Sequence, residues 1–216
     1  MEVLDNIRMP KKKGSIKTQV FISLSMLIFG ICLGTFSKFL DYRHASLPGL
    51  LRRMDEFLDF HNFLGGFAPW IVIAVCISVY SYTPIRASIN VFTFFIGMVS
   101  SYYVYSYFVA GFLPKSYAFI WVLFTILSPF CAFLSWYAKG KGMLSLMISA
   151  GMISLLINTA FAYGVFYVDI RSWLNVMMLM FGVIVLHKSF KETIGRIGLS
   201  IILAIIVDIV IPFHIW

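Results

Sequence analysis

Long runs of apolar residues alternate with short polar connections along most of the chain. Seven of these runs come close to the roughly 20 residues that a helix needs to cross about 30 Å of hydrocarbon. The runs are Thr18–Leu40, Phe67–Tyr82, Ile89–Phe108, Tyr117–Tyr137, Met143–Val168, Trp173–His187 and Ile197–Ile215. The connections hold turn-forming residues, such as Pro84 and Gly140. The pattern predicts an all-α fold, a polytopic transmembrane helix bundle with about seven spans.

Composition agrees with a membrane protein. The 216 residues are 61% hydrophobic and 12% charged, whereas soluble domains are about 25% charged. The net charge of +8 comes from basic residues in the short connections, and these do not form a stripe on a polar domain. We therefore expect the lipid bilayer as a partner and no nucleic acid.

The distribution of Lys and Arg predicts the orientation. Eleven of the 17 basic residues fall on the side of the N-terminus, and the other six are Lys38, Arg43, Arg52, Arg53, Lys115 and Arg171. Cytoplasmic connections carry the excess of positive charge, so the N-terminus is expected inside and the C-terminus outside. Residues 1–17 then form a basic cytoplasmic segment and residues 18–216 the transmembrane domain, in the cell (plasma) membrane.

The longest connection carries a helical pattern of its own. Over residues 48–62 the apolar residues fall on one face of a helix, and Arg52, Asp55, Glu56 and Asp59 fall on the opposite one. The segment is predicted to be an amphipathic helix in the outer interface that ends before Gly65. On such a helix Asp59 points away from His61, which argues against a catalytic or metal-binding pair there.

The last predicted span contains a carboxylate, Asp208. An acid near the centre of a membrane helix costs about 2.5 to 3.5 kcal/mol on insertion scales. Asp208 should therefore face other helices or a wet cavity. Two interpretations stay open, a hydrogen bond that only holds helices together and a functional site.

The first span carries a face of small residues that leads to an ionisable pair. Gly30 and Gly34 allow close packing of helices, and Lys38 and Asp41 continue the same face toward the outer surface. Lys38 either extends to the interface or pairs with Asp208, since both lie in the predicted outer half.

Two further spans carry polar side chains in the predicted outer half. The third ends in a cluster that includes Ser101 and Tyr103, and its four tyrosines belong either to the aromatic belt or to an outward-opening pocket. The fifth carries Asn158, which suits a hydrogen bond between helices as well as a ligand contact. The candidate ligand-binding set is Lys38, Asp41, Ser101, Tyr103, Asn158 and Asp208.

Three strings of residues resemble a known group of sequences. They begin at Gly30 (G-x-x-x-G-x-x-S-K-x-x-D), Gly97 (G-M-V-S-S-Y-Y) and Tyr107 (Y-F-V-A-G-F-L-P-K-S-Y). They are similar to small uncharacterised polytopic membrane proteins of Gram-positive bacteria. The resemblance covers the first half of the chain better than the second, and it implies no function for any residue.

Three functions are weighed. The convergence of polar residues in the outer half favours a protein that binds or transports a small solute or ion through an outward-facing polar cavity. The alternative is an accessory or immunity-type subunit that docks a partner membrane protein. An intramembrane enzyme acting on lipid or peptide is disfavoured, because hydrolase and metalloprotease motifs are absent from the sequence. The three cysteines show no ligand spacing, so we expect no catalytic residue, metal or cofactor.

Overall fold

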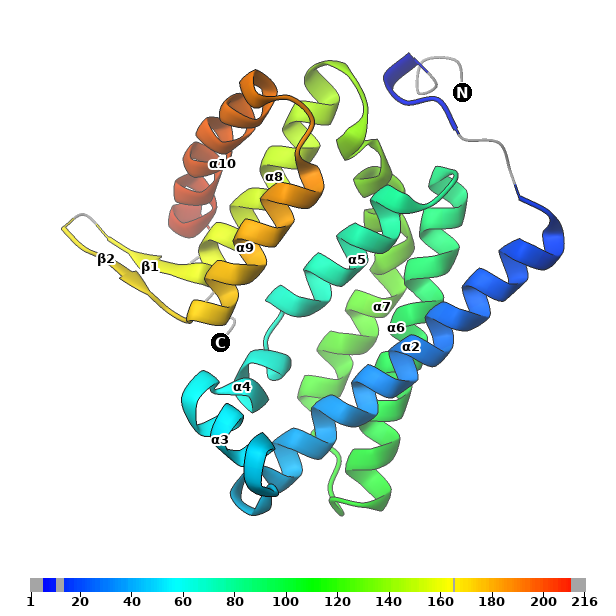
Figure 1. Ribbon diagram of the computed structural model, residues 1–216, viewed down its shortest axis with the longest axis vertical. Helices are drawn as coiled ribbons and strands as arrows, with labels where there is room; N and C mark the ends of the chain where they lie inside the picture. Colours follow the sequence, from blue (N-terminus) through cyan, green and yellow to red (C-terminus); the bar gives the residue numbers. More distant parts are fainter. Residues whose placement is uncertain (1–5, 11–13, 165, 211–216) are drawn as a thin grey trace.

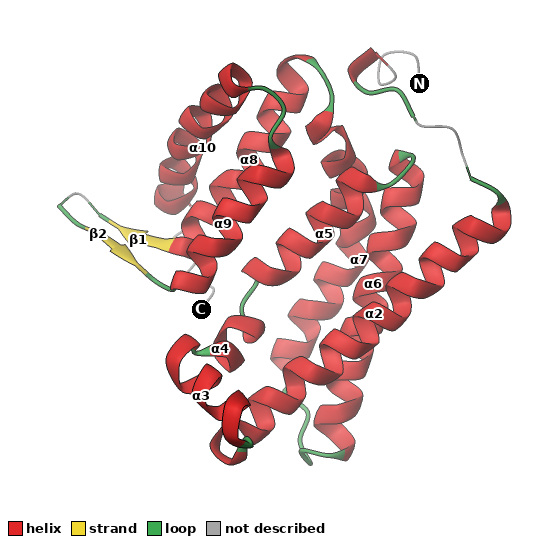
Figure 2. Cartoon of the chain, in the orientation of Figure 1, coloured by secondary structure: helices red, strands yellow, loops and turns green. Residues whose placement is uncertain are grey.

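The computed structural model describes residues 6–10, 14–164 and 166–210. The regular elements of the described chain are helices and one short hairpin, joined by loops (Figure 2). The principal helices are α2 (Ile16–Arg43), α5 (Ala68–Tyr80), α6 (Pro84–Phe108), α7 (Lys115–Trp136), α8 (Gly142–Ala160), α9 (Trp173–Leu186) and α10 (Phe190–Val210). The all-α prediction is confirmed at this level.

Five of these helices are long and apolar enough to cross a membrane: α2, α6, α7 with the 3-10 turn η2 (Tyr137–Lys139), α8 and α10. The other two, α5 and α9, are apolar but have 13 and 14 residues. At 1.5 Å per residue they are each about 20 Å long. The described chain thus has five helices that could span a membrane by length and composition, which is compatible with an integral membrane protein, and two shorter apolar helices beside them.

The helices form two groups (Figure 1). In the first, α2 packs along α6, α6 packs on α7, and α5 lies against both α6 and α7. In the second, α8 packs between α10 and α9. The groups meet where α5 contacts α9 and where η2 contacts α8.

Glycines on both helices bring α2 and α6 into direct backbone contact. A Cβ on Gly30 would lie 2.2 Å from the carbonyl oxygen of Phe94, and one on Gly34 would lie 2.1 Å from that of Met98. From the other side, a Cβ on Gly97 would lie 2.4 Å from the carbonyl oxygen of Leu27. The predicted small-residue face of the first span therefore packs on α6.

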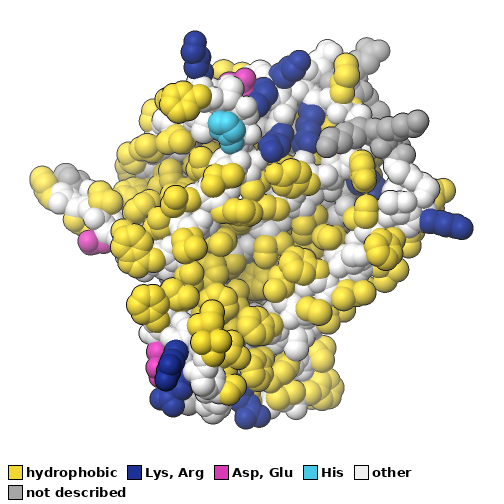
Figure 3. Space-filling view, viewed as in Figure 1, with side chains coloured by type: hydrophobic (Ala, Val, Ile, Leu, Met, Phe, Trp, Pro, Cys, Tyr) yellow, Lys and Arg dark blue, Asp and Glu magenta, His cyan; other side chains and the backbone are white. Residues whose placement is uncertain are grey.

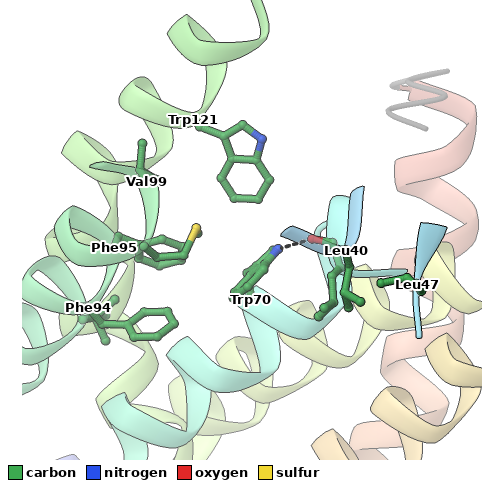
Figure 4. Packing of buried hydrophobic residues seen from close by; sticks show 11 residues of the cluster. Leu40, Leu47, Trp70, Phe94, Phe95, Val99 and Trp121 are labelled. Atoms are coloured by element: carbon green, nitrogen blue, oxygen red, sulfur yellow. Dashed lines mark hydrogen bonds between the residues drawn. The ribbon is translucent and has the colours of Figure 1, made fainter. Parts of the chain in front are cut away.

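Buried aromatic and aliphatic side chains fill the first group. Trp70 on α5 is surrounded by Phe94, Phe95 and Trp121, and its indole Nε1 donates a hydrogen bond to the carbonyl oxygen of Leu64 at 3.0 Å (Figure 4). This bond satisfies the polar end of a buried tryptophan and fixes α5 against the segment before it.

The face seen in Figure 3 is apolar across its middle, and Lys and Arg gather toward its upper end, with a smaller charged group at its lower end. The upper end, called here the basic end, contains residues 81–86, 137–142 and 187–190. The opposite end contains residues 44–66 and 109–114, and the hairpin strands β1 and β2, which follow the end of α8 far from the basic end, project to the side (Figure 1).

Arginines donate hydrogen bonds to carbonyl oxygens at helix C-termini at the basic end. Arg8 donates to the carbonyl oxygens of Val79, at 2.8 Å, and of Trp136, near the ends of α5 and α7. Arg196, almost fully buried on α10, donates to the carbonyl oxygen of Leu186, the last residue of α9. Cations at helix C-termini satisfy free carbonyls and the negative end of the helix dipole.

The predicted amphipathic helix over 48–62 is divided in two. Helix α3 (Gly49–Leu58) ends at Asp59, which has a left-handed backbone with φ 54°, and α4 (Phe60–Gly65) follows directly. Aspartate adopts this conformation more readily than most residues because its short side chain bonds locally. The expectation of one continuous helix was therefore wrong.

The predicted fifth span over Met143–Val168 also ends early. Helix α8 stops at Ala160, and the next residues form an antiparallel hairpin of β1 (Phe161–Tyr163) and β2 (Val168–Ile170). Aromatic residues here favour an extended chain, and Gly164 lies beyond β1. At the C-terminal span, α10 begins at Phe190, before the predicted Ile197, and residues 211–215 lie outside the described residues.

Candidate ligand-binding cavities

A cavity of about 870 Å³ lies at the end of the molecule opposite the basic end. Both helix groups line it, because Asp41 comes from α2 and Tyr117 from α7, whereas Thr159 and Asn175 come from α8 and α9. We call it the polar cavity. Its volume falls within the roughly 300–1,000 Å³ of small-molecule sites.

Asp41 is held at the edge of this cavity by Lys38. The lysine ammonium lies 2.5 Å from Asp41 Oδ2 and is stacked between the rings of Tyr102 and Phe112, at 5.1 and 4.8 Å from their centroids. The Tyr102 hydroxyl donates to the same carboxylate oxygen at 3.4 Å. Lys38 is buried, so the aromatic rings and the carboxylate replace the water that its charge has lost.

The break between α3 and α4 places a second set of ionisable groups beside the cavity. Asp55 is buried and accepts a hydrogen bond from the backbone N–H of His61 at 2.8 Å, so it caps the start of α4. His61 Nδ1 lies 2.9 Å from Asp55 Oδ2 and 3.6 Å from Asp59 Oδ1, and its ring stacks on that of His44. Asp59 and His61 both line the polar cavity.

The prediction that Asp59 points away from His61 was wrong for the same reason. It assumed a continuous helix, in which residues two apart face different directions. The left-handed turn at Asp59 brings the two side chains to one side. Asp59 is also tied to Asn62, whose amide donates to it at 2.8 Å.

The opposite wall of the polar cavity comes from the segment that links α8 to α9. Arg171 follows β2, and its Nε donates to the carbonyl oxygen of Phe161 at 3.0 Å. Asn175, in the first turn of α9, donates to the carbonyl oxygen of Thr159 at 2.9 Å. These bonds hold the wall in place, and Arg171 lines the same cavity as Asp41 and Asp59.

A second cavity, of about 410 Å³, lies between α5, α6 and α7 on one side and α8 and α10 on the other. Its walls are mostly apolar and include Trp70, Phe95 and Trp121. Leu127 on α7 and Leu155 on α8 line it and are about half exposed, so this cavity opens sideways between the two helix groups. We call it the apolar cavity.

The polar part of the apolar cavity contains Asp208 and Asn158. Asn158 Nδ2 donates to the carbonyl oxygen of Ala204 at 3.3 Å and ties α8 to α10, and the Tyr163 hydroxyl donates to Asn158 Oδ1. Burial and then the negative charge of Asp208 raise the pKa of Tyr163. Asp208 therefore faces a cavity next to a protonated hydroxyl and an amide.

The six predicted site residues fall in different places. Asp41 lines the polar cavity, with Lys38 buried behind it, while Asn158 and Asp208 line the apolar cavity. Ser101 donates to the carbonyl oxygen of Met98 at the contact between α2 and α6. Tyr103 lines a small void of about 20 Å³ with Trp70 and Tyr117. The alternative pairing of Lys38 with Asp208 does not form, since Lys38 is bonded to Asp41.

Sequence reasoning missed His61, Asn62, Arg171 and Asn175 as cavity residues. The first two follow Asp59, and an Asp was a usable signal for a break in the helix, because its side chain tolerates the left-handed backbone conformation. Arg171 and Asn175 gave no comparable signal, because the hairpin that positions Arg171 was assigned to a span.

Within the described part of the chain, no group of three or more His, Cys, Asp and Glu side chains could hold a metal ion. The three cysteines are free and lie on different helices.

Comparison with known proteins gives no relative: no family model, no curated protein and no solved structure matches this chain.

Proposed function

We propose that this protein is a seven-span plasma-membrane protein, with its N-terminus inside and C-terminus outside, that binds and moves a small solute or ion through the polar cavity. In this orientation the basic end faces the cytoplasm and the polar cavity opens outward. The excess of Lys and Arg at the basic end supports the orientation. The alternation of helix directions supports seven crossings, with α5 and α9 as short spans (Figure 1).

The observation that carries the proposal is the chemistry of the polar cavity wall. Carboxylates of Asp41 and Asp59 face the space together with the amide of Asn62, and Arg171 lies on the other wall. Lys38 compensates Asp41, whereas Asp59 is about two-thirds exposed, accepts a hydrogen bond from the neutral amide of Asn62 and lies 3.6 Å from Nδ1 of His61. A solute with a positively charged group is therefore favoured at the Asp59 wall.

The position of the polar cavity between the two helix groups supports movement of the solute. The cavity lies between the two helix groups, which contact each other through α5 and α9 and through η2 and α8. A displacement of one group against the other would change the width of the cavity while each group keeps its own packing. Rigid-body motion of this kind gives alternating access in transporters.

Binding can be tested on the purified protein in nanodiscs. The probes are sodium, potassium, ethanolamine, choline and glycine, and the readout is the shift of the thermal unfolding midpoint. A ligand at 100 times its Kd stabilises the folded state by about 2.7 kcal/mol. We expect at least one of the amine or cation probes to stabilise the wild type in a saturable way.

The matched variants are Asp59→Asn and Glu56→Gln. Asparagine also accepts the left-handed conformation, so Asp59→Asn removes the charge and keeps the turn. Glu56 is exposed on α3 and does not line the cavity. Weaker binding in Asp59→Asn with unchanged binding in Glu56→Gln supports the proposal, whereas equal binding in both variants, or no binding of any probe, contradicts it.

A further inference from the structure

The polar and apolar cavities adjoin each other. Phe67, Thr159 and Arg171 line both of them. A small polar solute would use only the first cavity. The combined shape instead has a charged compartment at one end and an apolar one of about 410 Å³ beside it.

We propose that the ligand is an amphiphile, with a head group that carries an ammonium in the polar cavity and an apolar chain in the apolar cavity. This inference rests on the proposed function and names the substrate class of the same site. The chain enters sideways, between Leu127 of α7 and Leu155 of α8, from the hydrocarbon that surrounds these helices.

The charges on the walls determine the head group. Asp41, Asp59 and Asp208 line the two cavities, and Arg171 is the arginine that lines both. Lys38 compensates Asp41, and the walls carry two further carboxylates, those of Asp59 and Asp208. An ammonium satisfies this arrangement, because the positive charge of the head group meets carboxylates on the walls.

The head group must supply the selectivity. An acyl chain that leaves the bilayer for the apolar cavity passes from one apolar environment to another, so its transfer gives little free energy. The protein as a whole has a net charge of +8 and attracts anionic lipids nonspecifically. Nonspecific attraction would therefore favour the anionic lipid, so a preference for an ammonium head group would show that the lipid binds at the cavity.

Tryptophan fluorescence gives a direct readout of chain entry. Trp70 and Trp121 line the apolar cavity but are almost completely buried, so a chain at the outer surface does not reach them. The protein is placed in phosphatidylglycerol nanodiscs and titrated with lysophosphatidylethanolamine that carries a brominated chain, which quenches tryptophan on contact. The same titration is made with brominated lysophosphatidylglycerol.

We expect saturable quenching by the ethanolamine lipid at a mole fraction about tenfold lower than for the glycerol lipid, the effect of one charge-assisted hydrogen bond. Trp121→Phe should reduce the amplitude of this quenching. Ala74→Phe, which fills the apolar cavity from α5, should abolish it, whereas Val122→Phe on the exposed face of α7 should not.

The outcomes separate this inference from the proposed function. If water-soluble ethanolamine still stabilises the protein but quenching is unsaturable, or is equal for the two lipids, or is unchanged in Ala74→Phe, the amphiphile is excluded and the solute site stands. If Ala74→Phe loses quenching yet keeps its stabilisation by ethanolamine, the variant is folded and the chain site is supported. If the wild type shows neither stabilisation by ethanolamine nor saturable quenching by the ethanolamine lipid, both proposals are contradicted.

Discussion

The ammonium of Lys38 lies 2.5 Å from Oδ2 of Asp41, one helical turn further along α2. The lysine is 3% exposed and the carboxylate 44%, so a buried cation is neutralised by an anion at the edge of the polar cavity. This pair links the packing of α2 on α6 to the cavity wall, because Tyr102 of α6 contacts both members.

Removal of the carboxylate should destabilise the fold more than removal of both charges. In Asp41→Ala the buried ammonium loses its counter-ion, at a cost near the lower end of about 3 to 5 kcal/mol, because Asp41 is itself half exposed. The double variant Lys38→Met/Asp41→Ala should recover most of this loss, since methionine keeps the contact with the aromatic rings. Thermal unfolding of the three proteins in detergent measures the difference. A double variant no more stable than Asp41→Ala would contradict a charge effect.

Addition of a single methyl group at Gly34 should separate α2 from α6. Because its Cβ would lie 2.1 Å from a backbone oxygen, Gly34→Ala is expected to cost about 1 to 3 kcal/mol. The control is Gly151→Ala on α8, where a Cβ meets nothing within 4 Å and the change should stabilise the helix by about 0.5 to 1 kcal/mol. Urea unfolding in mixed micelles compares the two. If both substitutions change the free energy of unfolding in the same direction, the backbone contact is not the reason that residue 34 must be a glycine.

Cysteine labelling in intact cells should establish the crossings. In a variant without its three native cysteines, Ser116→Cys in the first turn of α7 and Ser172→Cys just before α9 should react with a membrane-impermeant thiol reagent. Ser189→Cys, after α9, should react only once the cells are permeabilised. Ser172 and Ser189 flank the short helix α9, so equal reactivity of these two would mean that α9 does not cross the membrane.

The hydroxyl of Tyr163 should titrate above the usual range of tyrosine. Burial raises its pKa first and Asp208 adds to the rise, because a neighbouring negative charge disfavours the tyrosinate. In Asp208→Asn the pKa of Tyr163 should fall toward its ordinary value while remaining raised by burial. The tyrosinate absorbance that is lost in Tyr163→Phe isolates this residue. Asp169→Asn on the exposed hairpin is the control and should leave the titration unchanged.

Apolar runs predicted the helices well because the bilayer imposes one strong requirement, the internal pairing of every backbone polar group. The small face of Gly30 and Gly34 likewise identified a close helix contact before its partner was known. Both features depend on residues near one another in the sequence.

The cavities could not be predicted from local sequence patterns. The turn at Asp59 requires a left-handed backbone at one residue, and an amphipathic pattern that runs past it conceals the break. The hairpin after Ala160 consists of residues as apolar as a span, so hydropathy did not distinguish it from α8. Lys38 could pair with Asp41 or with Asp208. In the structure it pairs with Asp41, which lies on the same helix, so this pair needs no tertiary contact.

The lengths of α5 and α9 have a consequence for the surrounding lipid. Two apolar cylinders of about 20 Å stand beside longer ones, whereas unperturbed hydrocarbon is about 30 Å thick. Mismatch of this kind is relieved when the bilayer becomes thinner or when neighbouring groups cover the gap. The sideways opening between the helix groups would then sit at a local depression of the leaflet, where lipid head groups lie closer to the bilayer midplane than elsewhere.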